Sequence, residues 1–250
     1  MDTRTATATT ALVIQNQGGG GLGRWAAWLT ERGVTPHIVL AHEGGAVPDR
    51  LEHSALIVLG GVYLPDDDAN APWLPATRNL VRQALTDVTP MFGICLGGQM
   101  LAQVAGGEVR GSHGTPEFGS TRLSLLPDAV SDPLFRDLPE HPHAIQNHVD
   151  AVTALPAGAH WLIHSEHCPY QGFRVGPAAW GVQFHPETTA ERITGWNRDR
   201  LTRHGAPTPE TLLAQALRDE PAATDTWRTV AHRFADVVTA RAEPPGARRG

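Results

Sequence analysis

The neighbours of one cysteine restrict the backbone of this 250-residue chain more than any other feature. Cys95 follows the apolar run 88–94 and stands between Gly93 and Gly97, each two positions away. A nucleophile on a sharp turn from a strand into a helix needs nearly side-chain-free residues at those two positions, because the backbone there is strained and crowded. The pattern therefore predicts a strand, a nucleophile elbow at Cys95 and a helix.

The residues after the elbow predict a helix over 98–105 that ends at Gly106 and Gly107. Cys95 would then lie at the N-terminus of this helix, where free N–H groups and the positive end of the helix dipole stabilise a thiolate. A lone cysteine is more often a small buried hydrophobe. A catalytic interpretation therefore needs a base elsewhere in the sequence.

A histidine followed by a carboxylate supplies such a base. The run 178–184 is apolar enough for a buried strand, and His185, Pro186 and Glu187 follow it directly. Doubly wound sheets place their chemistry at the carboxyl ends of strands, where His185 would emerge. A carboxylate on one ring nitrogen fixes the tautomer and stabilises the imidazolium that forms when the thiol proton is taken. We therefore expect Cys95, His185 and Glu187 to form a catalytic triad.

These segments resemble the motifs of the class I, triad-type glutamine amidotransferases. The matches are Gly-Ile-Cys-Leu-Gly-x-Gln around Cys95 and Gln-Phe-His-Pro-Glu around His185, with a third match in the glycine pair 60–61 after the apolar run 55–59. The resemblance covers about residues 11–195 and is strongest to free-standing proteins that resemble the amidotransferase domain of GMP synthetase. It implies that the backbone N–H groups of Gly61 and Leu96 form an oxyanion hole.

The resemblance also implies residues that hold the substrate. Residues 146–150 are similar to the segment that lines the glutamine pocket in the family, which implies Asn147, His148 and Asp150 as substrate contacts. Gln99, one helical turn after Cys95, is implied as another. The family often has a glycine between the last two of the three pocket residues, where this chain has a valine. A surface loop satisfied by water is the competing interpretation of Asn147 and Asp150.

Alternating strand and helix patterns predict an α/β fold. The sheet is expected to be mainly parallel, or mixed, with helices on both faces, and the resemblance implies a flavodoxin-like class I glutamine amidotransferase fold. Shorter, turn-rich runs over 121–184 predict antiparallel additions. The predicted early strands are 11–14, 37–40, 55–59 and 88–94, and the predicted helices between them are 22–32 and 76–86.

Changes in pattern predict the domain boundaries. We expect a disordered tail over 1–10, an amidotransferase domain over 11–195, a helical C-terminal extension over 196–242 and a disordered tail over 243–250. Within the extension, prolines at 207, 209 and 221 predict breaks, with separate helices over 208–219 and 224–242.

Composition excludes several classes of function. All 20 basic residues are arginine, and without lysine the chain can form neither a pyridoxal-phosphate Schiff base nor a lysine-bearing phosphate loop. With 26 acidic residues, a net charge of −6 and no basic stripe, nucleic-acid binding is not expected. No run approaches the roughly 18 apolar residues of a membrane span. Two cysteines and no apolar signal core predict a cytoplasmic protein with no membrane partner.

Two further patterns indicate cofactors only weakly. Residues 18–23 contain the Gly-x-Gly-x-x-Gly of dinucleotide folds, but four consecutive glycines satisfy this pattern easily. We interpret the segment as a flexible loop near the edge of the active site. The histidines of 141–148 and 164–168 lack the second Cys-x-x-Cys or His-x-x-x-His unit of a metal site. We expect no cofactor and no metal.

The activity implied by the resemblance is hydrolysis of the glutamine side-chain amide through a thioester on Cys95. Ammonia would pass to a separate synthetase, which could dock through the helical tail, because the chain lacks the length for a synthetase domain. A γ-glutamyl peptide or conjugate hydrolase with the same triad is an alternative, which a wide, solvent-open pocket around 147–150 would favour. A partner-dependent regulatory subunit that is inactive alone is a second alternative.

Overall fold

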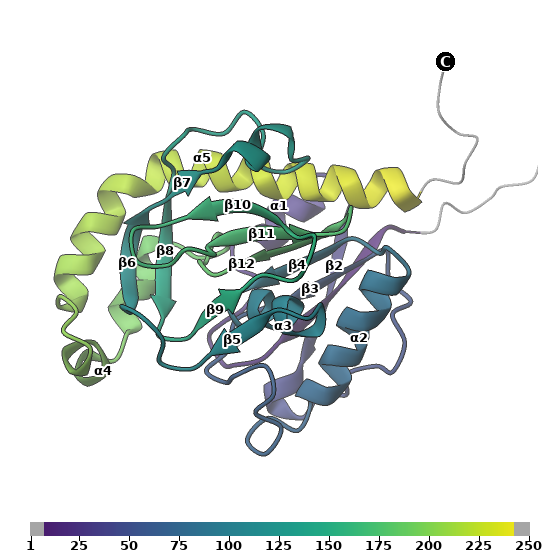
Figure 1. Cartoon of the computed structure of the whole chain (residues 1–250), viewed down its shortest axis with the longest axis horizontal. Helices are drawn as coiled ribbons and strands as arrows, with labels where there is room; N and C mark the ends of the chain where they lie inside the picture. Colours follow the sequence, from purple (N-terminus) through teal and green to yellow (C-terminus); the bar gives the residue numbers. More distant parts are fainter. Residues whose placement is uncertain (1–7, 243–250) are drawn as a thin grey trace, which may run out of the picture.

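An eight-stranded sheet organises the chain in the computed structural model, which describes residues 8–242 (Figure 1). The predicted tail over 243–250 lies outside the described residues, as does 1–7 of the N-terminal tail, whereas Thr10 already belongs to β1. The strands are β1 Thr10–Gln15, β2 Thr35–Leu40, β3 Ala55–Val58, β4 Met91–Ile94, β5 Glu108–Arg110, β6 Glu117–Arg122, β7 Ser124–Leu125, β8 His143–His148, β9 Ala151–Ala154, β10 His160–His164, β11 Gly172–Val175 and β12 Ala179–Val182. The helices are α1 Trp25–Thr30, α2 Leu74–Thr86, α3 Leu96–Val104, α4 Arg198–Arg203 and α5 Pro209–Ala242, with 3₁₀ helices at Ala41–Glu43, Pro127–Ser131 and Ala190–Gly195.

The sheet has a parallel half and an antiparallel half. Its strand order is β2-β1-β3-β4-β12-β11-β10-β7. Every neighbouring pair from β2 to β12 is parallel, and β11, β10 and β7 add to β12 in antiparallel fashion. The inner parallel strands read as unbroken apolar runs because both of their faces are buried. This arrangement confirms the predicted mixed α/β fold.

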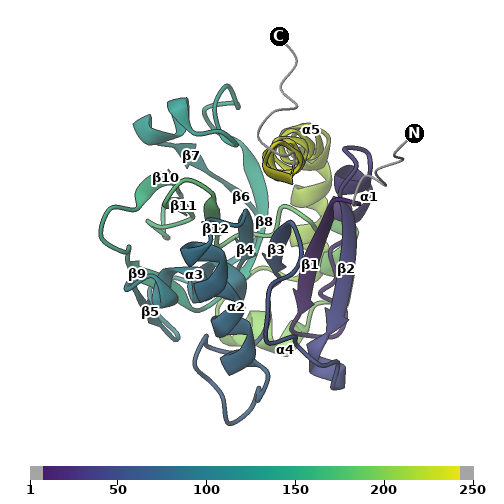
Figure 2. The same ribbon diagram turned by 90° about the vertical axis from the view of Figure 1, so that its right-hand side faces the viewer.

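Helices cover both faces of the parallel half. On one face, α1 and α5 pack against alternate strand residues that include Val13, Ile57 and Phe92. On the other face, α2 and α3 pack against the intervening residues, such as Leu12 and Val58. Figure 2 shows α2 and α3 on one side of the sheet and α5 on the other. The period-2 alternation of the strands therefore separates two apolar cores.

Two short two-stranded sheets accompany the main sheet, and one of them contacts the chain just after β12. They pair β5 with β9 and β6 with β8, both antiparallel. Ile145 of β8 forms an isolated antiparallel bridge with His185, and the His185 N–H donates to the Ile145 carbonyl at 2.8 Å. This bridge fixes the backbone that carries the predicted base.

The two helices predicted over 208–219 and 224–242 are one helix, so the predicted break at Pro221 is wrong. Pro209 is the first residue of α5 and Pro221 lies inside it. Proline removes one helical hydrogen bond and commonly bends a helix, and Figure 1 shows α5 bending in its first half. The carbonyl that loses its donor belongs to Leu217, which is 47% exposed and open to water.

Burial on both sides of Pro221 explains why the helix continues. Leu212 packs with Ile145 before the proline, and Trp227 and Phe234 enter the core under the sheet after it. The buried apolar side chains of α5 therefore pack against the chain's own sheets, whereas Leu217 is exposed. Docking of a synthetase through this helix stays a prediction. Among residues 8–242, no helix is both long and apolar enough to cross a membrane.

Candidate active site

The elbow at Cys95 has the geometry that its glycines predict. Cys95 is the single residue between β4 and α3, with φ 51° and ψ −107°. Its side chain is buried, and the residue is 7% exposed. A Cβ on Gly93 would overlap the carbonyl of Gly97, and a Cβ on Gly97 would overlap the carbonyl of Val58. Both glycines are therefore required by close backbone approaches, and they hold the sulfur at the start of a helix.

His185 and Glu187 lie together next to this elbow. Glu187 Oε1 is 2.8 Å from His185 Nδ1, which leaves Nε2 for the nucleophile. Gly60 lies close to both the ring and the cysteine. A Cβ at Gly60 would be 2.9 Å from His185 Cε1 and 3.4 Å from Cys95 Cβ. The absence of a side chain at this position lets the imidazole and the thiol face each other.

The charge of His185 follows from its surroundings. Burial disfavours the imidazolium, but the Glu187 carboxylate and the Cys95 sulfur outweigh this and raise the pKa of His185 to about 10. The ring is therefore protonated at neutral pH. The result is an imidazolium that can donate a proton to a leaving group.

The second cysteine has the opposite environment. Both Cys95 and Cys168 are free thiols. Burial and the nearby Glu117 raise the pKa of Cys168 to about 12. Cys168 therefore stays protonated at neutral pH and is a poor nucleophile.

Gly61 and Leu96, implied as oxyanion donors, are direct neighbours. A Cβ on Gly61 would lie 2.8 Å from Leu96 Cδ2. Gly61 follows β3 in the loop beside the elbow, and Leu96 is the first residue of α3. The fold thus brings these two backbone segments together next to Cys95.

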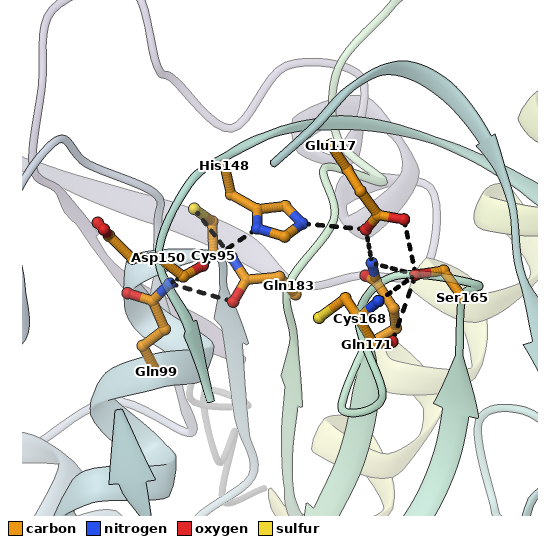
Figure 3. A network of polar contacts seen from close by, with 9 residues as sticks. All are labelled: Cys95, Gln99, Glu117, His148, Asp150, Ser165, Cys168, Gln171 and Gln183. Atoms are coloured by element: carbon orange, nitrogen blue, oxygen red, sulfur yellow. Dashed lines mark hydrogen bonds and ion pairs between the residues drawn. The ribbon is translucent and has the colours of Figure 1, made fainter. Parts of the chain in front are cut away.

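Two of the implied substrate contacts join a polar network that reaches the nucleophile. Gln99 Nε2 donates to the Asp150 carbonyl at 3.3 Å and to Gln183 Oε1 at 3.1 Å. Gln183 Nε2 in turn donates to Cys95 Sγ at 3.5 Å. Asp150 Oδ1 accepts from the backbone N–H of Ser112 at 2.8 Å. Figure 3 shows Gln99, Asp150 and Gln183 gathered around Cys95.

His148 extends this network away from the nucleophile. Its Nδ1 donates to the Asp150 carbonyl at 3.0 Å, and its Nε2 lies 3.2 Å from Glu117 Oε2. Ser165 and Gln171 also donate to the Glu117 carboxylate. The imidazole of His148 is buried, and each of its nitrogens has a hydrogen-bond partner (Figure 3). The side chain therefore holds the backbone of Asp150 in place.

Within residues 8–242, Glu117, His148 and Cys168 also form a group whose side chains could serve as metal ligands. One ligand atom from each lies within 4.8 Å of the others, and all three residues are buried. The hydrogen bonds from Ser165, Gln171 and His148 already occupy the Glu117 oxygens. Hydrogen bonding therefore accounts for this cluster without a cation.

Asn147 is the implied contact that faces open space. It lines a cavity of about 340 Å³ beside His185, and its Oδ1 accepts a hydrogen bond from Arg200 of α4. The glycine-rich segment 18–23 forms another wall, which places it at the edge of the active site as expected. Gln99, His148 and Asp150 are not among the cavity's lining residues.

The family model described as glutamine amidotransferase class-I matches residues 25–195, more than half of the chain. The chain belongs to the class I glutamine amidotransferases. Its mixed sheet with helices on both faces, the elbow at Cys95 and the contact between His185 and Glu187 agree with this assignment.

Named relatives of this amidotransferase are longer proteins. A GMP synthase (glutamine-hydrolyzing) of Aeropyrum pernix is 32% identical over 173 residues, which are 69% of this chain and 31% of that protein. One of Pseudomonas fluorescens is 36% identical over 146 residues, 56% of this chain and 26% of that protein. The chain thus spans under a third of the length of these relatives.

A solved structure matches nearly the whole chain. The crystal structure of a glutamine amidotransferase from Thermotoga maritima has a TM-score of 0.81 at 27% identity, and the match covers 92% of this chain and 99% of that one. Because the match covers more of the chain than the family model does, it includes much of the region after residue 195, where α4 and α5 lie.

Sequence reasoning missed several residues of this amidotransferase's site. Gln183 was part of the quoted motif, but its contact with Cys95 depends on the sheet register. Arg24 and Arg192 line the cavity. Their place in the sequence was the one signal for this: Arg24 directly follows the glycine-rich segment, and Arg192 comes five positions after Glu187. Glu117 had no local signal, because its partners are 31 to 54 positions away.

Proposed function

We propose that this amidotransferase hydrolyses the side-chain amide of glutamine through a Cys95 thioester and passes ammonia to a separate acceptor enzyme. The main support is the placement of His185 between Glu187 and Cys95, with a raised pKa that keeps the ring protonated. Relatives that match the chain over 26% and 31% of their own length are named as glutamine-hydrolyzing GMP synthases, which supports glutamine as the substrate.

In the proposed reaction the Cys95 thiolate attacks the amide carbon. The backbone N–H groups of Gly61 and Leu96 hold the oxyanion, and each such donor is typically worth about 3 to 4 kcal/mol of barrier. His185 gives its proton to the departing ammonia while Glu187 holds Nδ1. His185 then takes a proton from water, which attacks the thioester and releases glutamate.

The substrate end is proposed to rest on the network around Asp150. Gln99 has both of its N–H interactions directed at Asp150 and Gln183, so its position is fixed before substrate arrives. Asn147 presents its amide at the cavity, and Asp150 presents its backbone next to Gln99. His148 is proposed to act by holding the Asp150 carbonyl.

Replacing each cysteine in turn tests this proposal. Cys95→Ala should abolish ammonia release from glutamine, whereas Cys168→Ala should retain it, because Cys168 is a buried thiol outside the triad. A glutamine-like electrophile should label Cys95 in the wild-type chain. Retained turnover in Cys95→Ala would contradict the proposal, and no labelling with or without cell lysate would favour a regulatory subunit.

One observation favours hydrolysis of γ-glutamyl conjugates as a second candidate function. The cavity beside His185 measures about 340 Å³, which is far more than the roughly 10 to 15 Å³ that one water needs by the same measure. Ammonia needs far less room. Comparing kcat/KM for glutamine with that for a γ-glutamyl amide of a larger amine tests this candidate.

A further inference from the structure

The cavity beside His185 lies on the side of the site from which the leaving amine departs. His185 donates the proton that the leaving nitrogen takes, so this nitrogen must approach the imidazole. His185, Glu187 and Gly60 all line the cavity. Asn147, a proposed substrate contact, also lines the cavity, whereas Gln99 and Asp150 belong to the network around Cys95 and do not line it (Figure 3).

The walls of this cavity carry a positive charge that has no acidic partner among the described residues. Two arginines line it, Arg24 and Arg192. Arg24 is committed to the fold, since its side chain donates to the Pro186 carbonyl at 3.2 Å and to Thr224 Oγ1 at 2.8 Å. Arg192 is exposed, and within residues 8–242 its side chain has no hydrogen-bond or ion-pair partner.

The guanidinium of Arg192 lies at the wall of the cavity. Its guanidinium lies against the backbone of Gly19, since a Cβ added there would come within 3.3 Å of an Arg192 nitrogen. Glu187 is the acidic side chain among the lining residues, and its charge is paired with His185. The free charge in the cavity is therefore positive, and a guanidinium binds carboxylates with particular strength.

We infer that this cavity is a leaving-group subsite for γ-glutamyl amino acids or peptides, in which Arg192 binds a carboxylate carried by the leaving amine. This inference rests on the proposed thioester chemistry and specifies its substrate. Cys95 Sγ forms a bond to the γ-carbonyl carbon, the C–N bond breaks, and the nitrogen takes the His185 proton. The amino acid leaves with its carboxylate on Arg192, and water then splits the thioester to glutamate.

A matched pair of substrates tests the subsite on the purified full chain. γ-Glutamylglycine and γ-glutamylglycinamide differ only in a carboxylate against a carboxamide. The wild-type kcat/KM should be about tenfold or more higher for γ-glutamylglycine, because a charge-assisted hydrogen bond is worth about 1.5 to 3 kcal/mol. In Arg192→Gln the ratio of the two values should fall close to one.

Arg198→Gln is the matched control, because Arg198 is exposed, pairs with Glu210 and lies outside the cavity. It should keep the wild-type ratio. A wild-type ratio near one, a high ratio that survives in Arg192→Gln, or an equal loss in Arg198→Gln would each overturn the subsite. Glutamine as a third substrate separates failure of the subsite from failure of the proposed function. Cys95-dependent ammonia release without a preference for γ-glutamylglycine overturns the subsite alone. Absence of Cys95-dependent turnover for all three substrates overturns the proposed function as well.

Discussion

At the scale of single residues, the proposed chemistry depends on the contacts of Cys95, His185 and Glu187. Cys95 and His185 face each other across Gly60, and Glu187 holds the far nitrogen of the ring. Burial lowers the pKa of the imidazole, and the charge of the Glu187 carboxylate is the largest contribution that raises it. The acidity of the proton donor is therefore set by Glu187.

Glu187→Gln tests this dependence. In the proposed reaction protonated His185 is the donor, so activity should be lost as pH rises through the pKa of His185, which is about 10 in the wild type. Removing the carboxylate lowers this pKa, so the alkaline limb of the kcat/KM profile should move to lower pH, with a loss of roughly 10² to 10⁴-fold in rate. Glu210→Gln, an exposed position on α5, serves as the control. An unmoved alkaline limb in Glu187→Gln would contradict this assignment.

The two cysteines should differ in reactivity. At neutral pH, iodoacetamide should modify Cys95 well before Cys168, since burial and Glu117 keep the Cys168 thiol protonated. Mass spectrometry of the two tryptic peptides measures the two rates. Faster modification of Cys168 would show that its environment is wrongly described.

At the scale of elements, close backbone packing holds the elbow in position. The start of α3 lies so near β3 that no side chain fits at Gly97. Cys95 donates its backbone N–H to Val182 of β12 at 2.8 Å, so the elbow is also tied to the strand that precedes His185. The nucleophile and the base are thus positioned by neighbouring strands of one sheet.

Gly97→Ala should destabilise the chain by more than about 4 kcal/mol, because its Cβ would overlap the Val58 carbonyl. Gly195→Ala is the control, since a Cβ there meets no atom within 4 Å, and it should change stability by less than about 0.5 kcal/mol. Urea unfolding followed by tryptophan fluorescence measures both. Equal stability of Gly97→Ala and the wild type would refute the packing argument.

The sequence predicted the strands and the helix near Cys95 well, because each is indicated by residues that are adjacent in the sequence. The glycine frame of Cys95 and the apolar runs of β3, β4 and β12 each follow from a few adjacent residues. The continuity of α5 through Pro221 depends on burial against distant strands, which no local pattern carries. The free charge of Arg192 likewise depends on where the glycine-rich loop folds.

At the scale of the whole molecule, the C-terminal region is part of the core and of the site. Phe234 of α5 stacks with Trp25 and Phe92 under the sheet. The Trp227 indole donates to the His143 carbonyl at 2.9 Å. Arg24 links α5, through Thr224, to the carbonyl of Pro186 in the triad segment. Residues of α5 therefore share their cores with residues before 195, and the boundary at 195/196 stays a prediction.

Trp227→Ala should cost about 3 to 5 kcal/mol of stability, as for other buried aromatics. Leu217→Ala, on the same helix but 47% exposed, should change stability little. Chemical denaturation monitored by circular dichroism compares them. Similar small effects for both would mean that α5 contributes no core.

The thioester itself provides the most direct test of the proposed chemistry. Acid quenching of the chain during turnover of glutamine, followed by mass spectrometry, should find one γ-glutamyl group on the peptide that contains Cys95, and none in Cys95→Ala. Ammonia release without this adduct, or an adduct on Cys168, would contradict the assignment of Cys95 as the nucleophile.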